Sequence, residues 1–389
     1  MKDKVAVVGM GCSKFGERWD CSIEDLIVEA VTEGLADAGI GKEDVDALFY
    51  SSSFITGASA VAVDALKLDG IPAYHNENWC CSGHIALIQA AMAVACGVYD
   101  TVLVLGAEKL KDTGAGGLGV GRGNTPVMEN RRTAPGSFGL IGQRYFHEYG
   151  LTYEEGRRAL ARIAVKNHAN GYLSPKAHFH KLITIEDALK APIIAAPLGL
   201  YDCCGTSDGA SCAILTRVDM AKGFRNDPIY IKGFGVSHGC MPHYDPNFDW
   251  LHFPALKKSS QAAYRMAGVE NPREDISLAE VHDCFTVTEM AIYENFDFCD
   301  EGTAHKLLHE GYFDRDGKIP VNVDGGLKCF GHPVGASGIR MTYELYKQLQ
   351  GRVDNPKRQV KGNLHLGLSH TFGGPPQLSA VLIVGNELG

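Results

Sequence analysis

The sequence predicts an α/β protein with five layers, α/β/α/β/α, in which one pattern of strands and helices occurs twice. Short apolar runs rich in Val and Ile alternate with longer amphipathic runs along the 389 residues. The order of these runs repeats from about residue 228. The helical runs are long enough for right-handed crossovers between parallel strands. We therefore expect two mixed sheets related by a pseudo-twofold axis, with an inserted loop domain.

The first copy opens with the strand "KVAVVGMG" and the helix "IEDLIVEAVTEGLADAGI". The strand "DVDALFYSSS", the region around Cys80 with its helix, and the strand "TVLVLGAE" follow. After a long excursion, "GASCAILTR" closes this half. The opening strand does not complete a dinucleotide-binding G-x-G-x-x-G motif, because Lys14 stands where the third glycine is required.

The second copy has the same order. "PIYIKGFGVSHG" matches the first strand, "ALKKSSQAAYRMAGV" the first helix and "DISLAEVHDC" the second strand. "GHPVGASGIRMTYELYKQLQG" stands where the Cys80 helix stood, and the strands "NLHLGLSH" and "LSAVLIVG" end the chain. We predict an N-terminal half over residues 1–225, with the insertion at about 109–201, and a C-terminal half over 226–389. The alternative is one irregular Rossmann-like domain followed by a helical domain.

Composition narrows the function. The net charge of −9 argues against nucleic-acid binding, which needs a dense Lys and Arg surface. No apolar run is long enough to span a membrane, and the N-terminus reads as a strand with no signal-peptide cleavage site. Twelve cysteines without any C-x-x-C spacing indicate reduced thiols, so we expect a cytoplasmic protein. "HGCMPH" lacks a fourth ligand and is not expected to hold a metal; we predict no metal site.

The repeat makes a geometric prediction about Cys80 and His332. They occupy matching strand-to-helix turns, and two helix N-termini related by a pseudo-twofold axis can converge on one point. A helix N-terminus offers unpaired N–H groups and partial positive charge, which lower a thiol's pKa and favour the nucleophilic thiolate. The same amides could bind the oxyanion of a thioester intermediate.

Four separated motifs in this chain resemble those of the thiolase superfamily. They are "CCSG" with Cys80, "HDCF" with His282, "GGLKCFGHPVGASG" with His332, and "SHTFGG" with His370. "GAEKL", "YFHEYG" and "DCCGTSDGASCAIL" are similar to the sterol-carrier-protein-X and archaeal branch, which includes specialised members such as benzoylsuccinyl-CoA thiolase. The resemblance covers essentially the whole chain and implies a duplicated thiolase fold.

The resemblance also implies a mechanism. The Cys80 thiolate attacks a 3-oxoacyl-CoA, the C–C bond breaks, and free coenzyme A then takes the acyl group from Cys80. His332 activates the thiol, and His282 stands where many thiolases have Asn in an oxyanion hole. The backbone N–H of Cys80, with that of Gly373 or Gly374, forms a second hole. Coenzyme A is thus a co-substrate, and no covalently bound cofactor is implied.

The last motif departs from the family pattern. Many degradative thiolases have a cysteine there that protonates and deprotonates the α-carbon, whereas "SHTFGG" has none. His370 is the natural substitute, because imidazole titrates near neutral pH. The other cysteines, including Cys81, Cys204 and Cys284, are interpreted as packed thiols.

Ligand and partner contacts follow. Arg122, Arg131 and Arg132 form the best local basic patch for coenzyme A phosphates, with a solvated loop as the alternative. Phe285, Gly335 and Ala336 are further predicted substrate contacts. The resemblance implies a homodimer or a dimer of dimers, and a small accessory subunit with a zinc ribbon and an OB-fold.

Aromatic residues in or beside the motifs could line a pocket for a bulky or aromatic acyl group. Two rival functions remain. One is a condensing synthase or aldolase of the same fold, although aldolases of the lipid-transfer type lack the nucleophilic cysteine. The other is a non-catalytic acyl or sterol carrier, which would not need Cys80, His332 and His370 together.

Overall fold

The computed structural model describes the whole chain apart from residues 58, 114–132, 241 and 243–244. Among the described residues, nine strands form one mixed sheet in the order β3-β2-β4-β7-β1-β8-β11-β10-β9, and β5 and β6 form a small second sheet. The strands are β1 (Val5–Cys12), β2 (Ala47–Ser51), β3 (Ala73–Asn76), β4 (Thr101–Glu108), β5 (Ile193–Ala195), β6 (Leu198–Gly199), β7 (Gly209–Arg217), β8 (Ile229–His238), β9 (Leu278–Glu280), β10 (Leu366–Gly373) and β11 (Leu378–Gly385).

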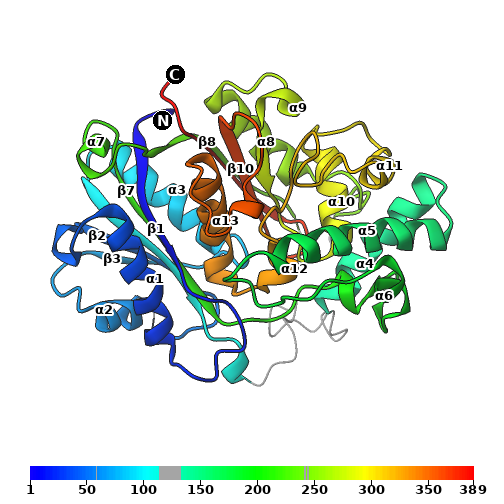
Figure 1. Cartoon of the computed structure of the whole chain (residues 1–389), viewed down its shortest axis with the longest axis horizontal. Helices are drawn as coiled ribbons and strands as arrows, with labels where there is room; N and C mark the ends of the chain where they lie inside the picture. Colours follow the sequence, from blue (N-terminus) through cyan, green and yellow to red (C-terminus); the bar gives the residue numbers. More distant parts are fainter. Residues whose placement is uncertain (58, 114–132, 241, 243–244) are drawn as a thin grey trace.

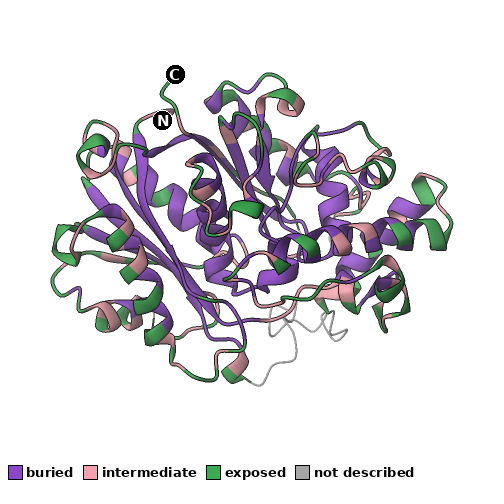
Figure 2. Ribbon diagram, in the orientation of Figure 1, coloured by how far each residue is buried: buried purple, intermediate pink, exposed green. Residues whose placement is uncertain are grey.

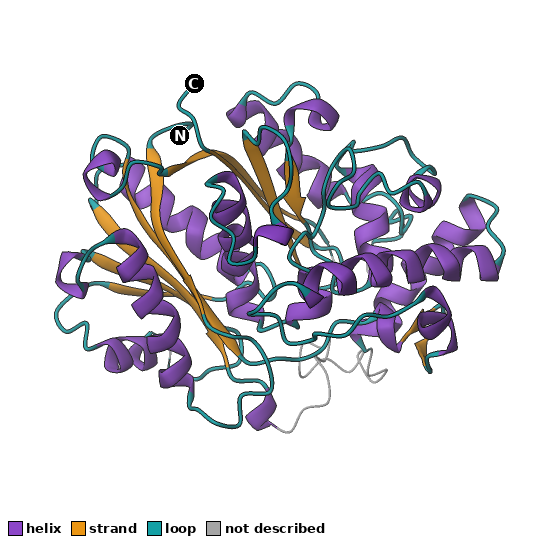
Figure 3. Cartoon of the chain, viewed as in Figure 1, coloured by secondary structure: helices purple, strands orange, loops and turns teal. Residues whose placement is uncertain are grey.

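The helices follow the expected alternation with the strands (Figure 3). They are α1 (Ile23–Ala38), α2 (Ala60–Leu66), α3 (Ser82–Ala95), α4 (Ala134–Glu148), α5 (Tyr153–Tyr172), α6 (Ile185–Lys190), α7 (Ala221–Phe224), α8 (Pro254–Ala267), α9 (Pro272–Asp275), α10 (Thr286–Asn295), α11 (Ala304–His309), α12 (Gly326–Phe330) and α13 (Val334–Leu349). None of the helices in the described part of the chain is long and apolar enough to cross a membrane.

The duplicated architecture is confirmed. β1, α1, β2, α3, β4 and β7 recur in the same order as β8, α8, β9, α13, β10 and β11. In both halves the last two strands pair antiparallel, β4 with β7 and β10 with β11. The two predicted sheets meet through a short antiparallel contact of β1 with β8, which pairs Ala6 with Tyr230 and Val7 with Ile229 and makes the sheet continuous.

Five layers result from the way the helices cover this sheet. α1 packs on the outer face of the first half, and α8 on the outer face of the second. α3 and α13 lie side by side between the halves (Figure 1). Both central helices are buried along most of their length (Figure 2), which explains why α3 is apolar on every side.

The chain between β4 and β7 carries α4, α5, α6 and the β5–β6 hairpin. α5 begins at a capping box formed by Thr152 and Glu155 and packs against α10 and α12 of the second half. One of its buried residues, Asn167, donates to the carboxylate of Asp283 at 2.9 Å. That carboxylate also accepts from the amides of Leu327 and Lys328, at 2.6 and 3.1 Å. The inserted segment therefore supports α12, which leads directly into the turn with His332.

Candidate active site

Cys80 lies in the turn that joins β3 to α3, one residue before the helix cap, Cys81. Trp79 adopts a left-handed conformation (φ 50°), and the amide of Cys81 donates to the carbonyl of Asn78 at 3.1 Å. This tight turn leaves Cys80 partly exposed and buries Cys81, whose thiol donates to the carbonyl of Thr371 at 3.0 Å. The two adjacent thiols therefore have separate environments.

His332 lies in the corresponding turn of the second half, between α12 and α13. The hydroxyl of Ser337 donates to the carbonyl of Pro333 at 2.9 Å and lies 2.8 Å from His332 Nδ1. Because a hydroxyl has only one hydrogen, it must accept from Nδ1–H. His332 Nε2 therefore carries a lone pair, and this buried atom has no hydrogen-bond partner among the described residues.

The two turns converge because glycines let α3 and α13 approach closely. A Cβ placed on Gly83 would lie 2.8 Å from the carbonyl oxygen of Gly335, and one on Gly338 would lie 2.8 Å from the amide nitrogen of His84. Such separations exclude any side chain at the crossing. The predicted convergence of the two helix N-termini is confirmed.

Cys80, His282 and His332 form one cluster. The Cys80 sulfur and one nitrogen of each imidazole lie within 4.8 Å of one another. The two rings are 5.3 Å apart between centroids and inclined by 75°. Burial lowers the pKa of His332 to about 3, and burial followed by repulsion from His332 holds the pKa of His282 well below its ordinary value. Both imidazoles are therefore neutral at pH 7, and His332 can accept a proton.

The thiol of Cys80 corrects one expectation. The position before a helix predicts a lowered pKa, but burial raises the pKa of this thiol to about 12. The backbone amides of Gly374 and of Cys80 itself counteract the effect of burial only in part. Loss of hydration outweighs the helix terminus here, so the resting site holds a neutral thiol beside a neutral imidazole.

Gly374 brings its amide to the Cys80 sulfur in a left-handed turn (φ 72°) after β10. A Cβ on Gly374 would lie 2.5 Å from the ring of Trp79, so the indole packs directly on the glycine. Gly373 lies against the other side of the nucleophile turn, where its Cβ position is 2.9 Å from the carbonyl oxygen of Asn78. Of the predicted oxyanion donors, the amides of Cys80 and Gly374 lie against the Cys80 sulfur; their role in an oxyanion hole stays a prediction.

His370 is not one of the three clustered side chains, but its imidazole interacts electrostatically with His282. The side chains of Ser369 and Thr371, its neighbours on β10, both bond His84 in the central layer. Alternation along the strand turns His370 to the outer face. There its ring packs on Phe296 and Phe372, with centroids 5.2 and 4.5 Å away. The role of His370 as α-carbon acid and base stays a prediction.

Cys284 and Cys204, which are interpreted from the sequence as packed thiols, lie near Cys80. Cys284 and Cys204 are joined by a backbone hydrogen bond of 2.9 Å, and both thiols interact electrostatically with Cys80. Burial raises the pKa of Cys284 well above its ordinary value, so it is a protonated thiol at neutral pH. Its place two residues after His282 in "HDCF" was the available signal. Phe285, next in the chain, is buried against the ring of Phe138 at 4.9 Å.

Gly335 and Ala336 are used for docking the two halves. The hydroxyls of Ser51 and Ser211 donate to the carbonyls of Gly335 and Ala336, at 2.7 and 2.6 Å. A Cβ on Gly335 would lie 2.4 Å from the carbonyl oxygen of Ser51. Both residues are buried against strands of the first half. Both residues therefore have a packing role, and their contact with substrate stays a prediction.

Glu108, the last residue of β4, strengthens this junction. Its buried carboxylate accepts from the amides of Ser53 and Gly335, at 2.6 and 3.2 Å, and from the hydroxyl of Ser52 at 3.1 Å. Burial raises its pKa to about 7 although these hydrogen bonds lower it. One carboxylate thus connects the first half to the N-terminal turn of α13.

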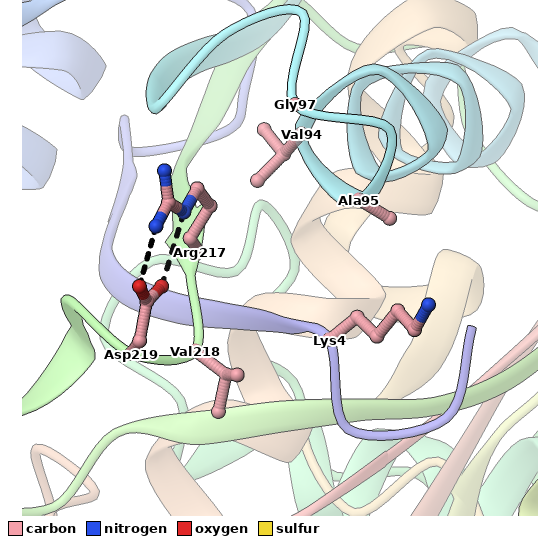
Figure 4. Close-up of a pocket in the computed structure, with 7 residues that line it drawn as sticks. All are labelled: Lys4, Val94, Ala95, Gly97, Arg217, Val218 and Asp219. Atoms are coloured by element: carbon pink, nitrogen blue, oxygen red, sulfur yellow. Dashed lines mark hydrogen bonds and ion pairs between the residues drawn. The ribbon is translucent and has the colours of Figure 1, made fainter.

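Arg122, Arg131 and Arg132 fall outside the described residues. Figure 4 shows a cavity at the far end of α3 that is lined by Lys4, Arg217 and Asp219, among others. Arg217 Nε donates there to Asp219 Oδ1 at 3.1 Å. Since α3 has 14 residues, that cavity is separated from Cys80 by roughly 20 Å along the helix.

Comparisons with known proteins agree with this geometry. The family model described as "Thiolase, N-terminal domain" matches residues 5–219, and "Thiolase C-terminal domain-like" matches residues 242–386. An acetyl-CoA acetyltransferase of Methanothermobacter thermautotrophicus is 35% identical, with 98% of this chain and 99% of that protein covered. The benzoylsuccinyl-CoA thiolase subunit BbsB of Thauera aromatica is 29% identical, with 96% of each covered.

Solved structures share the fold. The Ltp2-ChsH2(DUF35) aldolase has a TM-score of 0.85 at 24% identity, with 99% of this chain and 98% of that chain covered. Human mitochondrial 3-ketoacyl-CoA thiolase has a TM-score of 0.73 at 18% identity, with 99% of each chain covered. The family models, the full-length relatives and the converging Cys and His turns lead to one conclusion: the chain belongs to the thiolase family.

Proposed function

We propose that the chain is an acyl-CoA C-acyltransferase that cleaves a 3-oxoacyl-CoA with coenzyme A, or runs the reverse Claisen condensation, through an acyl-enzyme on Cys80. The observation that carries the proposal is the placement of Cys80, His282 and His332 within 4.8 Å of one another. Full-length relatives named acetyl-CoA acetyltransferase, 35 and 36% identical, support it.

The first step begins with the Cys80 thiol and the His332 imidazole both neutral. The lone pair on His332 Nε2 accepts the proton of the Cys80 thiol, and the sulfur attacks the keto carbon of the substrate. The amides of Cys80 and Gly374 donate to the oxygen that becomes negative. Because both donors are backbone groups held by the Trp79 turn, they need no rearrangement during the step.

The second step breaks the C–C bond and releases an acyl-CoA enolate. His282 and the now protonated His332 would stabilise the enolate oxygen, since each offers an N–H that is not used elsewhere. The α-carbon needs a proton, and Cys284 is the thiol we propose to donate it. In the return half, the Cys284 thiolate takes the thiol proton of coenzyme A, whose sulfur attacks the acyl-enzyme and leaves as a thioester. The released Cys80 thiolate then takes its proton back from His332.

The test of this function is a thiolysis assay. Purified protein is mixed with acetoacetyl-CoA or bulkier 3-oxoacyl-CoAs and free coenzyme A, and loss of the substrate thioester is followed. Turnover that requires coenzyme A supports the proposal. An aldolase would release an aldehyde or ketone without consuming coenzyme A, and a carrier would bind acyl-CoA without turnover. Either result would contradict the proposed thiolase function.

Cys284 can be tested separately from Cys80. Cys284→Ala should still form the acyl-enzyme slowly but lose exchange of the α-protons of acetyl-CoA with deuterated water. The loss should be about 100-fold or more, as for a general acid–base group. Cys204→Ala is the matched control and should keep that exchange. Normal exchange in Cys284→Ala would remove Cys284 from the mechanism.

Ligand, partners and location complete the proposal. Arg122, Arg131 and Arg132 are proposed contacts for coenzyme A phosphates, so their substitution by Ala should raise the KM for coenzyme A.

We place the enzyme in the cytoplasm, because its twelve cysteines carry no disulfide. We expect a homodimer through β3, the sheet edge on which Tyr74 is exposed.

The acyl group and the accessory subunit are best tested together. One relative is named as a subunit of benzoylsuccinyl-CoA thiolase, and one fold neighbour is a complex with a DUF35 protein. We therefore propose a bulky or aromatic acyl substrate and a small accessory protein. A panel of aliphatic and aromatic 3-oxoacyl-CoAs, run with and without a co-expressed DUF35-type protein, should show higher activity with the partner.

A further inference from the structure

A second property follows from the ligand chemistry of the same three side chains. Cys80 offers a sulfur, and His282 and His332 each offer an imidazole nitrogen. One thiolate and two imidazoles are a preferred ligand set for Zn²⁺, which leaves a fourth tetrahedral position for water. We propose that Cys80, His282 and His332 bind a soft divalent cation such as Zn²⁺, and that the bound cation reversibly blocks the nucleophile.

The distances allow this with small side-chain movements. The three ligand atoms lie within 4.8 Å of one another. Ligand atoms of a tetrahedral zinc site lie roughly 3.3–3.6 Å apart, given Zn–N of about 2.0 Å and Zn–S of about 2.3 Å. Each side chain therefore needs to move by less than about 1 Å. Cys80 is partly exposed in its turn, which leaves it room to do so.

The histidines are already in the form that a metal requires. Both are neutral, and His332 is held by Ser337 in the tautomer with its lone pair on Nε2. Such an outer hydrogen bond is what orients a metal-bound imidazole. His332 Nε2 and His282 Nδ1 are both buried without a hydrogen-bond partner among the described residues. A cation bound to His332 Nε2 would give that lone pair a partner.

Binding replaces one proton by the metal. The S–H bond of Cys80 breaks, a Zn–S bond forms, and the proton leaves to solvent, without oxidation or reduction. The Zn²⁺–thiolate unit carries one net positive charge. Glu108 interacts electrostatically with Cys80, and its ionised form offsets that charge. The same sulfur then cannot attack a carbonyl, so metal and substrate compete.

The experiment titrates coenzyme-A-free protein with Co²⁺ and then with Zn²⁺ as a competitor. The expected result is one equivalent of Co²⁺ with a thiolate-to-metal charge-transfer band, displaced by one equivalent of Zn²⁺. Cys80→Ser should abolish the band and weaken Zn²⁺ binding by more than about 100-fold, since outer hydrogen bonds alone are worth 10–100-fold. The matched control is the double variant His238→Ala with Cys240→Ser, which removes two exposed ligands of "HGCMPH".

Two outcomes would overturn the proposal: a band that persists in Cys80→Ser, or one that disappears in the His238 and Cys240 variant. A second measurement needs no variant. Zn²⁺ should slow alkylation of Cys80 by iodoacetamide at least tenfold in the native protein, and EDTA should restore the rate; equal rates with and without Zn²⁺ would contradict it. Neither measurement involves turnover, so a protein that binds Zn²⁺ but lacks thiolysis would disprove only the proposed function.

Discussion

The turn that carries Cys80 and the turn that carries His332 occupy the same place in the two halves, yet they have diverged. In the first half, a left-handed Trp79 leaves residue Cys80 partly exposed, while its thiol is buried enough to raise the pKa. In the second half, His332 is buried and its tautomer is set by Ser337. The repeated fold supplies two converging helix ends, and local hydrogen bonds give each turn a different environment. One environment suits the proposed nucleophile and the other the proposed base.

The largest expected effect comes from removing the nucleophile. Cys80→Ala should reduce thiolysis by about 10,000-fold or more, because covalent catalysis is lost. Cys81→Ala is the adjacent control and should stay within about tenfold, since it loses only core packing and one weak hydrogen bond. Steady-state kcat/KM measures both. Equal losses in the two variants would show that the turn does not separate their roles.

The second effect concerns the base. His332→Ala should lower kcat/KM by about 1,000-fold, within the range for general-base groups. Ser337→Ala should lower it by about tenfold, because Nδ1–H loses the acceptor that fixes the tautomer. Since the folded pKa of His332 is lowered to about 3, it is neutral above that pH, and the wild-type profile should show no acid limb between pH 5 and 7 from this group. An acid limb that disappears in His332→Gln would contradict this assignment.

The third effect tests the helix crossing that joins the two turns. Gly338→Ala puts a Cβ 2.8 Å from the amide nitrogen of His84 and should force α3 and α13 apart. The expected loss of stability is about 1–3 kcal/mol, as for overpacked cores. Urea unfolding measures it, with Lys347→Ala, on the same helix but away from the crossing, as the control. An unchanged free energy of unfolding in Gly338→Ala would mean that the close approach is not needed.

The fourth effect is on reactivity at the first turn. Because the pKa of Cys80 is raised to about 12, thiolate is scarce at neutral pH. Alkylation by iodoacetamide should rise about tenfold per pH unit from pH 7 to 10. Peptide mass spectrometry separates Cys80 from the exposed Cys96, which serves as the internal reference. A rate for Cys80 that is already at its plateau at pH 7 would indicate a resting thiolate instead.

The smallest effect concerns Glu108. Glu108→Gln keeps the shape of the side chain but loses one of the acceptor oxygens that bind Ser52, Ser53 and Gly335. We expect a drop in kcat of about tenfold with little change in KM, and a shifted pH profile near neutrality. The native pKa is raised to about 7, so the stabilising protonated form is present at low pH and is lost as pH rises through 7. Unchanged kcat and pH profile would limit Glu108 to packing.

The fold and the convergence of Cys80 with His332 could be predicted from the sequence, because their signals are local. Strand β7, for example, coincides with the apolar run "GASCAILTR". The raised pKa of the Cys80 thiol could not be predicted from the sequence, because it results from burial that both halves produce together. The orientation of His370 could not be predicted, because the register of β10 sets which side of the strand packs on Phe296 and Phe372. The proximity of Cys284 to Cys80 could not be predicted, because it depends on segments that are far apart in the sequence and meet only in the folded protein.

The most direct test of the account is to trap the acyl-enzyme. The protein is mixed with acetoacetyl-CoA without free coenzyme A, quenched in acid and digested, and the peptide with Cys80 and Cys81 is fragmented in a mass spectrometer. The account predicts one acetyl group on Cys80, released when coenzyme A is added. An acetyl group on Cys81 or Cys284, or turnover with no acylated cysteine, would contradict it.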